Sequence, residues 1–101
     1  MHTVLRKRIE ILADAPLLPR LLVALEECGI DGHTVLPASS GAGRTGRWSE
    51  DRLTGTSKLL LVAIASDAHA AALVDRLAPL LDSHRLLLTL SAIEVVRGDR
   101  F

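Results

Sequence analysis

The sequence predicts an α+β domain whose strands and helices follow one another in the order β-α-β-β-α-β. Two segments carry leucines at helical spacing, and an aspartate suited to capping a helix precedes each of them. Four other segments are rich in β-branched residues or are apolar at nearly every position, which is typical of strands. At 101 residues the chain suits one hydrophobic core, so a single domain is expected over residues 1–101.

The first strand and the first helix are predicted from two different periodicities. In Val4–Ala13 the alternating pattern puts Ile9 and Ile11 on one face, and Arg8 and Glu10 on the other. Asp14 is expected to cap the helix that follows, which ends at Gly29. The helical spacing is carried by Leu18, Leu21, Leu22 and Leu25.

Three further strands are predicted over residues 30–39, 58–65 and 85–96. The unbroken apolar run Leu59–Ala65 favours a strand that is covered on both faces. Asp67 is expected to cap a second helix over Ala68–Leu81, and Pro79 should kink or shorten its last turn. This order is the ferredoxin-like arrangement, in which two helices cover one face of a four-stranded antiparallel sheet.

Two helices leave the second face of such a sheet without a cover. The segments Leu59–Ala65 and Leu86–Leu90, the second interrupted only by Thr89, are apolar at consecutive positions and therefore present apolar side chains to both faces. Large open apolar surfaces are uncommon on soluble monomers. We therefore expect another copy of the chain to cover the second face, the alternative being a monomer with an apolar surface.

Composition narrows the classes of function and location. Twelve basic residues balance twelve acidic ones and only two residues are aromatic, which disfavours nucleic-acid binding. The single cysteine, Cys28, allows no intrachain disulfide, and no apolar run reaches the length of a membrane span. A cytoplasmic protein is expected. No metal site is expected, because the four histidines lack partners at metal-ligand spacing.

A glycine- and arginine-rich stretch, "SSGAGRTGRW" at Ser39–Trp48, follows the second predicted strand. Its backbone amides can converge into a nest for an anion, and arginines add permanent positive charge. The alternative is a mobile hairpin loop whose arginines serve only solubility. The nest residues are Gly41, Ala42 and Gly43, and the candidate anion-binding residues are Gly43, Arg44, Arg47 and Lys58.

The segment "GIDGHTVLPASSGAGRTG", Gly29–Gly46, resembles the PII signalling family in its G-I-x-G-x-T-V motif and the G-x-G-R that follows. The resemblance extends over nearly the whole chain and is strongest to the carboxysome-associated PII-like branch. It implies a homotrimer with adenine nucleotides in the clefts between subunits. It also implies a signalling loop between the second and third predicted strands, the T-loop, at about Gly41–Ser57.

Motif by motif, the resemblance implies a set of nucleotide-binding residues. Thr34 and Ile64 would lie near the adenine, and Arg97 would reach in from the C-terminal segment. The phosphates would lie near Gly41, Ala42, Gly43 and Arg44.

The chain also departs from the classical PII pattern. "LDSHRL" at Leu81–Leu86 stands where classical members carry a glycine- and lysine-rich phosphate loop, which favours ADP or AMP over ATP. Thr45 replaces the glutamine that helps to chelate magnesium with 2-oxoglutarate, and the chain has no tyrosine to be uridylylated. These losses imply the inorganic-carbon branch, with bicarbonate as co-ligand and a protein target contacted through the T-loop.

Three other functions remain open at this stage. The chain could be a classical nitrogen-regulatory PII protein that senses ATP, ADP and 2-oxoglutarate, or a ligand-free ferredoxin-like assembly module. The enzyme alternative is an acylphosphatase, which shares the βαββαβ order. The glycine- and arginine-containing loop that acylphosphatases place after the first strand is absent from "ILADAPLLPR", so no enzyme is expected.

Overall fold

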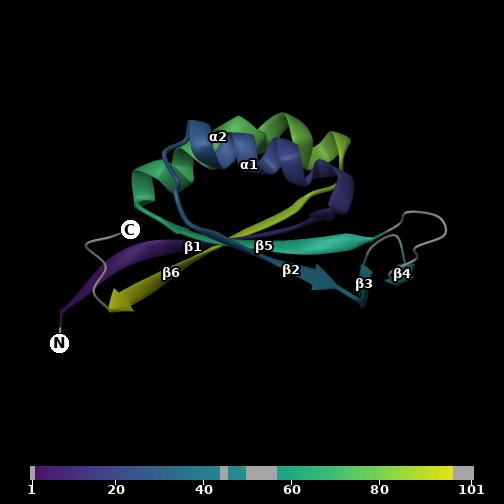
Figure 1. Ribbon diagram of the computed structural model, residues 1–101, viewed down its shortest axis with the longest axis horizontal. Coiled ribbons are helices and arrows are strands. Elements are labelled where there is room, and N and C mark those ends of the chain that lie inside the picture. Colours follow the sequence, from purple (N-terminus) through teal and green to yellow (C-terminus); the bar gives the residue numbers. More distant parts are fainter. Residues whose placement is uncertain (1, 44–45, 50–56, 97–101) are drawn as a thin grey trace.

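The α+β arrangement predicted from the sequence is confirmed by the computed structural model, which describes residues 2–43, 46–49 and 57–96. The main sheet has four antiparallel strands in the order β2-β5-β1-β6. Two helices lie together on one face of this sheet (Figure 1). The elements are β1 Thr3–Asp14, the 3-10 helix η1 Ala15–Leu17, α1 Leu18–Glu27, β2 His33–Ala38, β3 Ser40–Gly43, β4 Gly46–Ser49, β5 Lys58–Ala65, α2 Asp67–Ser83 and β6 Leu87–Val96.

The hydrophobic core lies between the sheet and the helix layer. Ile9 and Ile11 of β1 are fully buried there, as the alternation of the strand predicts, while Arg8 and Glu10 form a 2.8 Å ion pair with each other. Among the described residues, all buried side chains are apolar. The two helices contribute Leu21, Ala24, Leu25, Ala70, Leu73, Leu77 and Leu80 to this core.

β5 alternates strictly between buried and half-buried residues, because only one face of the sheet meets the helices. On the other face, side chains from all four strands form a leucine row: Leu36 pairs with Leu60, Leu60 with Leu12, and Leu12 with Leu87. Leu36 and Leu87 remain 47% and 58% exposed. The sequence predicts that β5 is covered on both faces. Within the described residues, the helices cover one face of β5, and the other face is open.

Both predicted helix caps differ from the structure. Asp14 makes no capping hydrogen bond, and a turn of 3-10 helix separates it from α1. Ser66 caps α2 instead, since its Oγ accepts a hydrogen bond from the backbone N–H of His69 at 3.1 Å. Asp67 becomes the first residue of α2, where its charge complements the positive end of the helix.

Pro79 does not shorten α2, which continues to Ser83. Proline removes one backbone N–H, and with it the helical hydrogen bond to the carbonyl four residues earlier. The next turn is nevertheless closed, because the backbone N–H of His84 donates to the Leu80 carbonyl and Ser83 Oγ donates to the Pro79 carbonyl. Burial of Leu77 and Leu80 holds this end of the helix against the sheet.

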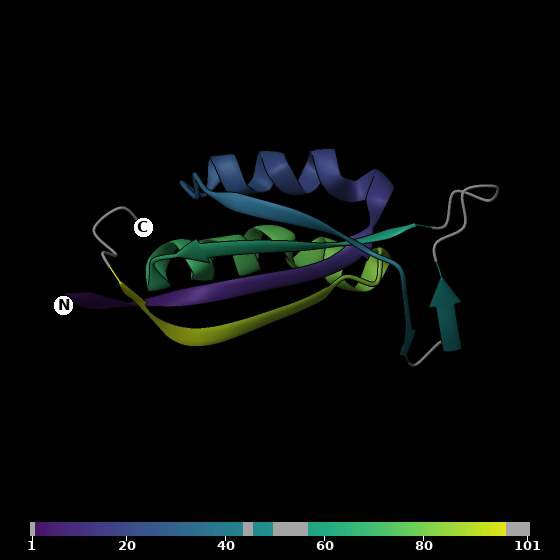
Figure 2. The ribbon, with the colours of Figure 1, turned by 60° about the horizontal axis from the view of Figure 1, so that its bottom comes forward.

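The glycine- and arginine-rich stretch after β2 contains two short strands, β3 and β4, instead of an irregular loop. β3 and β4 form a separate antiparallel ribbon beside one end of the main sheet (Figure 2). Gly41 pairs with Trp48, and Gly43 pairs with Gly46, whose φ of 109° only glycine adopts easily.

Candidate functional site at the base of the loop

An ion pair marks the point where the long β2–β5 connection returns to the sheet. Lys58 begins β5 and is the register partner of Asp14, the last residue of β1. Lys58 Nζ lies 2.7 Å from Asp14 Oδ1, with side chains 27% and 56% exposed. This contact explains why Asp14 does not cap a helix: its carboxylate accepts from Lys58 instead.

A pocket of about 480 Å³ opens beside this ion pair, and we call it the loop-base pocket. It forms where the end of β1, the start of β5 and the turn after α2 meet. Lys58 and Arg85 bring two permanent cations to it against one carboxylate, which suits an anionic ligand. Its lining residues are Asp14, Pro16, Leu17, Lys58, Ser83, His84 and Arg85.

His84 and Ser83 form a directed hydrogen-bond chain at one wall of this pocket. Ser83 Oγ donates to the Pro79 carbonyl at 2.8 Å, so its contact with His84 Nδ1, also 2.8 Å, is one in which the imidazole N–H donates. The other ring nitrogen, Nε2, then faces Nη1 of Arg20 at 3.5 Å as an acceptor. This chain of contacts selects the tautomer of His84 that carries its proton on Nδ1.

Arg85 has a φ of 51°, in the left-handed region that non-glycine residues seldom occupy. The strained residue reverses the chain between α2 and β6, which lets Leu86 enter the core at 8% exposure. Only residues 84–86 connect the two elements. The turn is therefore too short to wrap a ligand with a long backbone loop.

The predicted adenine residues lie on the open face of the main sheet, opposite the helices. Thr34 of β2 is exposed and pairs with Val62 of β5, and Ile64 lies two residues further along β5 on the same face. Ile64 is also the register partner of Arg8. The structure thus brings these two predicted residues onto one surface, away from the loop-base pocket.

The structure does not bring the amides of the predicted anion nest together. Gly41, Ala42 and Gly43 belong to the extended strand β3, in which successive amides point to opposite sides and cannot converge. Arg47 is exposed on β4, opposite Ala42, and belongs to a different sheet from Lys58. The predicted residues Arg44 and Arg97 lie outside the described part of the chain.

Of the residues that line the loop-base pocket, only Lys58 is predicted as a site residue from the sequence, and the ionisable residues Asp14, His84 and Arg85 are not. Asp14 precedes a predicted helix and is therefore expected to cap it, and "LDSHRL" differs from the classical pattern by the phosphate loop that it lacks. The adjacent basic pair His-Arg at the end of an amphipathic helix was the available signal. In the residues that the structure describes, no three His, Cys, Asp or Glu side chains gather as a metal site.

The fold and the loop-base pocket define a small α+β protein with basic side chains around a pocket at the base of its long loop. The chain belongs to the nitrogen regulatory protein P-II family, whose model matches residues 6–100. Proteins of this family are regulatory and are not enzymes. Comparison with curated proteins gave no match. Across the part of the chain that is described, α1 and α2 lack the length and apolar character of a transmembrane helix.

Solved structures share this fold at low sequence identity. CPII of Thiomonas intermedia, a nitrogen regulatory PII-like protein bound to ADP, AMP and bicarbonate, matches with a TM-score of 0.85 and 18% identity over 93% of this chain and 91% of CPII. A PII-like signalling protein of Thermus thermophilus gives 0.83 and 24% over 100% and 99%. The Bacillus subtilis GlnK–ATP complex gives 0.63 and 13% over 88% and 82%.

Proposed function

We propose that this protein is a PII-like sensor that binds an adenine nucleotide together with bicarbonate. The observation that carries the proposal is the loop-base pocket, in which Lys58, His84 and Arg85 line a 480 Å³ space at the foot of the long loop. The structural similarity to CPII, a protein described with ADP, AMP and bicarbonate bound, supports this choice of ligands.

ADP or AMP is preferred over ATP in this proposal. A terminal phosphate needs several converging donors, usually backbone amides of a glycine-rich loop together with a lysine. The three-residue turn at 84–86 offers few such amides, and the strained conformation of Arg85 fixes its course. One or two phosphates would instead be held by the side chains of Lys58 and Arg85, which line the same pocket.

The nucleotide site is completed by a second copy of the chain. We propose that the leucine row on the open face packs between the copies of a homotrimer, with a nucleotide cleft at each junction. Thr34 and Ile64 would contact the adenine from this face, and Arg97 would reach the nucleotide from the C-terminal segment. Residues 41–44 at the start of the loop would contact the phosphates.

Bicarbonate is proposed to bind beside the phosphates and to report through the loop at about residues 41–57. The proposed ligands are Gly43, Arg44, Arg47 and Lys58. Lys58 already pairs with Asp14, so an arriving anion competes with that carboxylate. Arg47 lies on the β3–β4 ribbon, so binding to it would couple the anion to the ribbon's position. We further propose a cytoplasmic, carboxysome-associated role in inorganic-carbon metabolism, exerted on a protein target through the loop.

Isothermal titration with ADP, AMP, ATP and cyclic AMP, each with and without bicarbonate or 2-oxoglutarate, tests the proposal. Tighter binding of ADP or AMP than of ATP, strengthened by bicarbonate, is the expected result. Strengthening by 2-oxoglutarate with magnesium would establish the classical nitrogen sensor instead. If no nucleotide gives a heat of binding, the ligand-free ferredoxin-like assembly module is favoured instead. In a separate assay, turnover of an acylphosphate would establish an acylphosphatase.

A further inference from the structure

We propose that the groove between α1 and α2 docks an acidic segment of a partner protein, which inserts an apolar side chain between the helices. The groove has a volume of about 360 Å³, at the lower end of the range for ligand pockets, ~300–1,000 Å³. It is lined by Pro19, Arg20, Val23, Arg76, Leu77, Pro79 and Leu80. The inference does not depend on nucleotide binding.

The middle of the groove is apolar. Val23 of α1 is 49% exposed there, above the buried residues Leu77 and Leu80 of α2. Pro19 and Pro79 flank it with rigid rings that lose little conformational entropy when they are covered. An apolar side chain placed here would be removed from water without any rearrangement of the two helices.

The charged side chains that line the groove are both arginines. The Nε–H of Arg76 donates to Glu27 Oε2 at 2.9 Å, so the Nη groups of Arg76 can donate to another acceptor. Arg20 contacts the acceptor His84 Nε2 at 3.5 Å, and no ion pair joins it to a carboxylate within the described ranges. A carboxylate of a partner would give Arg20 an ion pair in addition to its contact with the neutral acceptor His84 Nε2.

These features favour an acidic peptide over a polyanion. Nucleic acids and anionic membranes bind tightly to surfaces that carry many spaced cations. This groove has only two arginines, and Asp75 and Asp82 of α2 are exposed acidic residues that would repel a polyanion. A peptide can present one apolar side chain flanked by carboxylates. The helices α1 and α2, whose residues line the groove, lie on the opposite side of the sheet from its open face (Figure 1), so an assembly formed through that face leaves the helix layer accessible.

Fluorescence anisotropy with short labelled peptides tests this surface. The probe places glutamates around a leucine–phenylalanine pair, and two matched peptides replace the glutamates by lysines or the apolar pair by serines. The full chain should bind the acidic apolar probe saturably and each matched peptide at least tenfold more weakly. Arg20→Gln and Val23→Asp should each weaken binding at least tenfold, whereas Lys7→Gln, which removes a cation outside the groove, should not.

Several results would overturn the proposal. These are equal binding of the lysine peptide, an Arg20→Gln variant that binds like Lys7→Gln, or no saturable binding of the acidic probe. Binding to phosphatidylglycerol vesicles in place of the probe would assign the arginines to a membrane. If Val23→Asp unfolds, as circular dichroism would reveal, the Arg20→Gln and serine-peptide comparisons still decide the matter.

Discussion

Lys58 Nζ lies 2.7 Å from Asp14 Oδ1, and the two residues are register partners where β1 ends and β5 begins. The pair joins the foot of the long loop to the wall of the loop-base pocket. Both side chains are partly exposed, so the contact contributes little to stability and an arriving anion can compete for it.

Asp14→Asn should tighten ADP binding several-fold. The substitution releases Lys58 from this carboxylate, which also opposes an anionic ligand in the pocket. The free energy of unfolding should fall by no more than about 1 kcal/mol, because the ion pair is partly exposed. Calorimetry at low and high salt measures the affinity. Asp67→Asn, which removes a carboxylate paired with Lys7, is the matched control. Unchanged ADP affinity in Asp14→Asn would exclude competition at Lys58.

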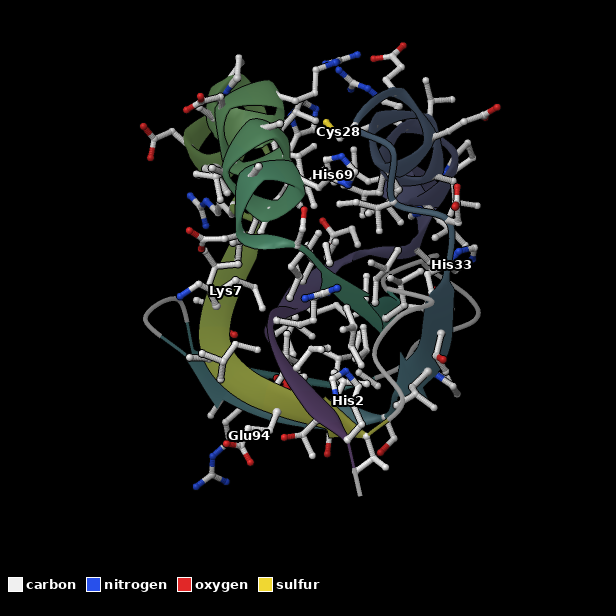
Figure 3. All side chains as sticks on the ribbon, turned by 90° about the vertical axis from the view of Figure 1, so that its left-hand side faces the viewer. His2, Lys7, Cys28, His33, His69 and Glu94 are labelled. Carbon is white, nitrogen blue, oxygen red and sulfur yellow. The ribbon has the colours of Figure 1, made fainter. Side chains whose placement is uncertain are left out.

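Gly29→Ala should destabilise the fold by about 1–2 kcal/mol, because Gly29 has a φ of 75°, a conformation that strains residues with a Cβ. An added Cβ would also lie 3.1 Å from the His69 ring, which Figure 3 shows between the two helices near Cys28. Urea denaturation of Gly29→Ala alone and with His69→Ala separates strain from crowding.

The double variant Gly29→Ala/His69→Ala, which lacks the imidazole ring, should recover part of the lost free energy of unfolding. The part due to backbone strain at residue 29 should remain lost. Gly32→Ala is the control, since nothing lies within 4 Å of its added Cβ. Equal stabilities of Gly29→Ala and Gly32→Ala would contradict the prediction.

Leu36→Asp should convert the expected trimer to monomers. Leu36 lies at the edge of the leucine row and is 47% exposed, so a charge there is tolerated in a single chain but not between packed copies. Analytical ultracentrifugation at micromolar concentration provides the measurement. Val23→Asp, at a residue of similar exposure on the helix layer, should remain trimeric. A wild-type monomer would refute both the assembly and the intersubunit site.

Arg97→Ala should weaken nucleotide binding by roughly 1.5–3 kcal/mol, the usual range for a hydrogen bond to a charged group. Arg97 follows β6 directly and is expected to reach the phosphate or ribose of the nucleotide. Calorimetry on a variant confirmed as trimeric gives the affinity. An unchanged value would make Arg97 an ordinary surface charge.

Bicarbonate and the nucleotide should bind cooperatively, with a coupling of about 1–3 kcal/mol that is the same in either order of addition. In the proposed mechanism the nucleotide would fix the start of the loop, which would lower the ordering cost that remains for the anion. Nucleotide titrations in bicarbonate and in chloride, at equal pH and ionic strength, with Trp48 fluorescence as a second readout, measure this coupling.

Arg44→Gln and Arg47→Gln should each abolish the cooperativity. The two ligands are both negative and repel each other, and we expect both arginines to be needed to offset this repulsion. Identical affinities in bicarbonate and chloride, together with constant Trp48 emission, would exclude the dual-ligand mechanism.

The sequence by itself determined the order of the two helices and the four strands of the main sheet, and the faces of β1. Alternation of residues 8–11 separates the buried Ile9 and Ile11 from the paired Arg8 and Glu10, as predicted. The apolar runs likewise predicted an open sheet face, which the leucine row provides. These features follow from local periodicity, because residues a few positions apart decide which side chains leave water.

Only the tertiary structure decided the partners of individual polar groups. Asp14 and Ser66 both precede helices, but Asp14 is drawn to Lys58, forty-four positions away, and Ser66 is left to cap. The loop-base pocket depends in the same way on strand register, which brings the turn at His84–Arg85 beside the start of β5. Long-range register is set by the packing of the whole core, so no short stretch of sequence specifies such a contact.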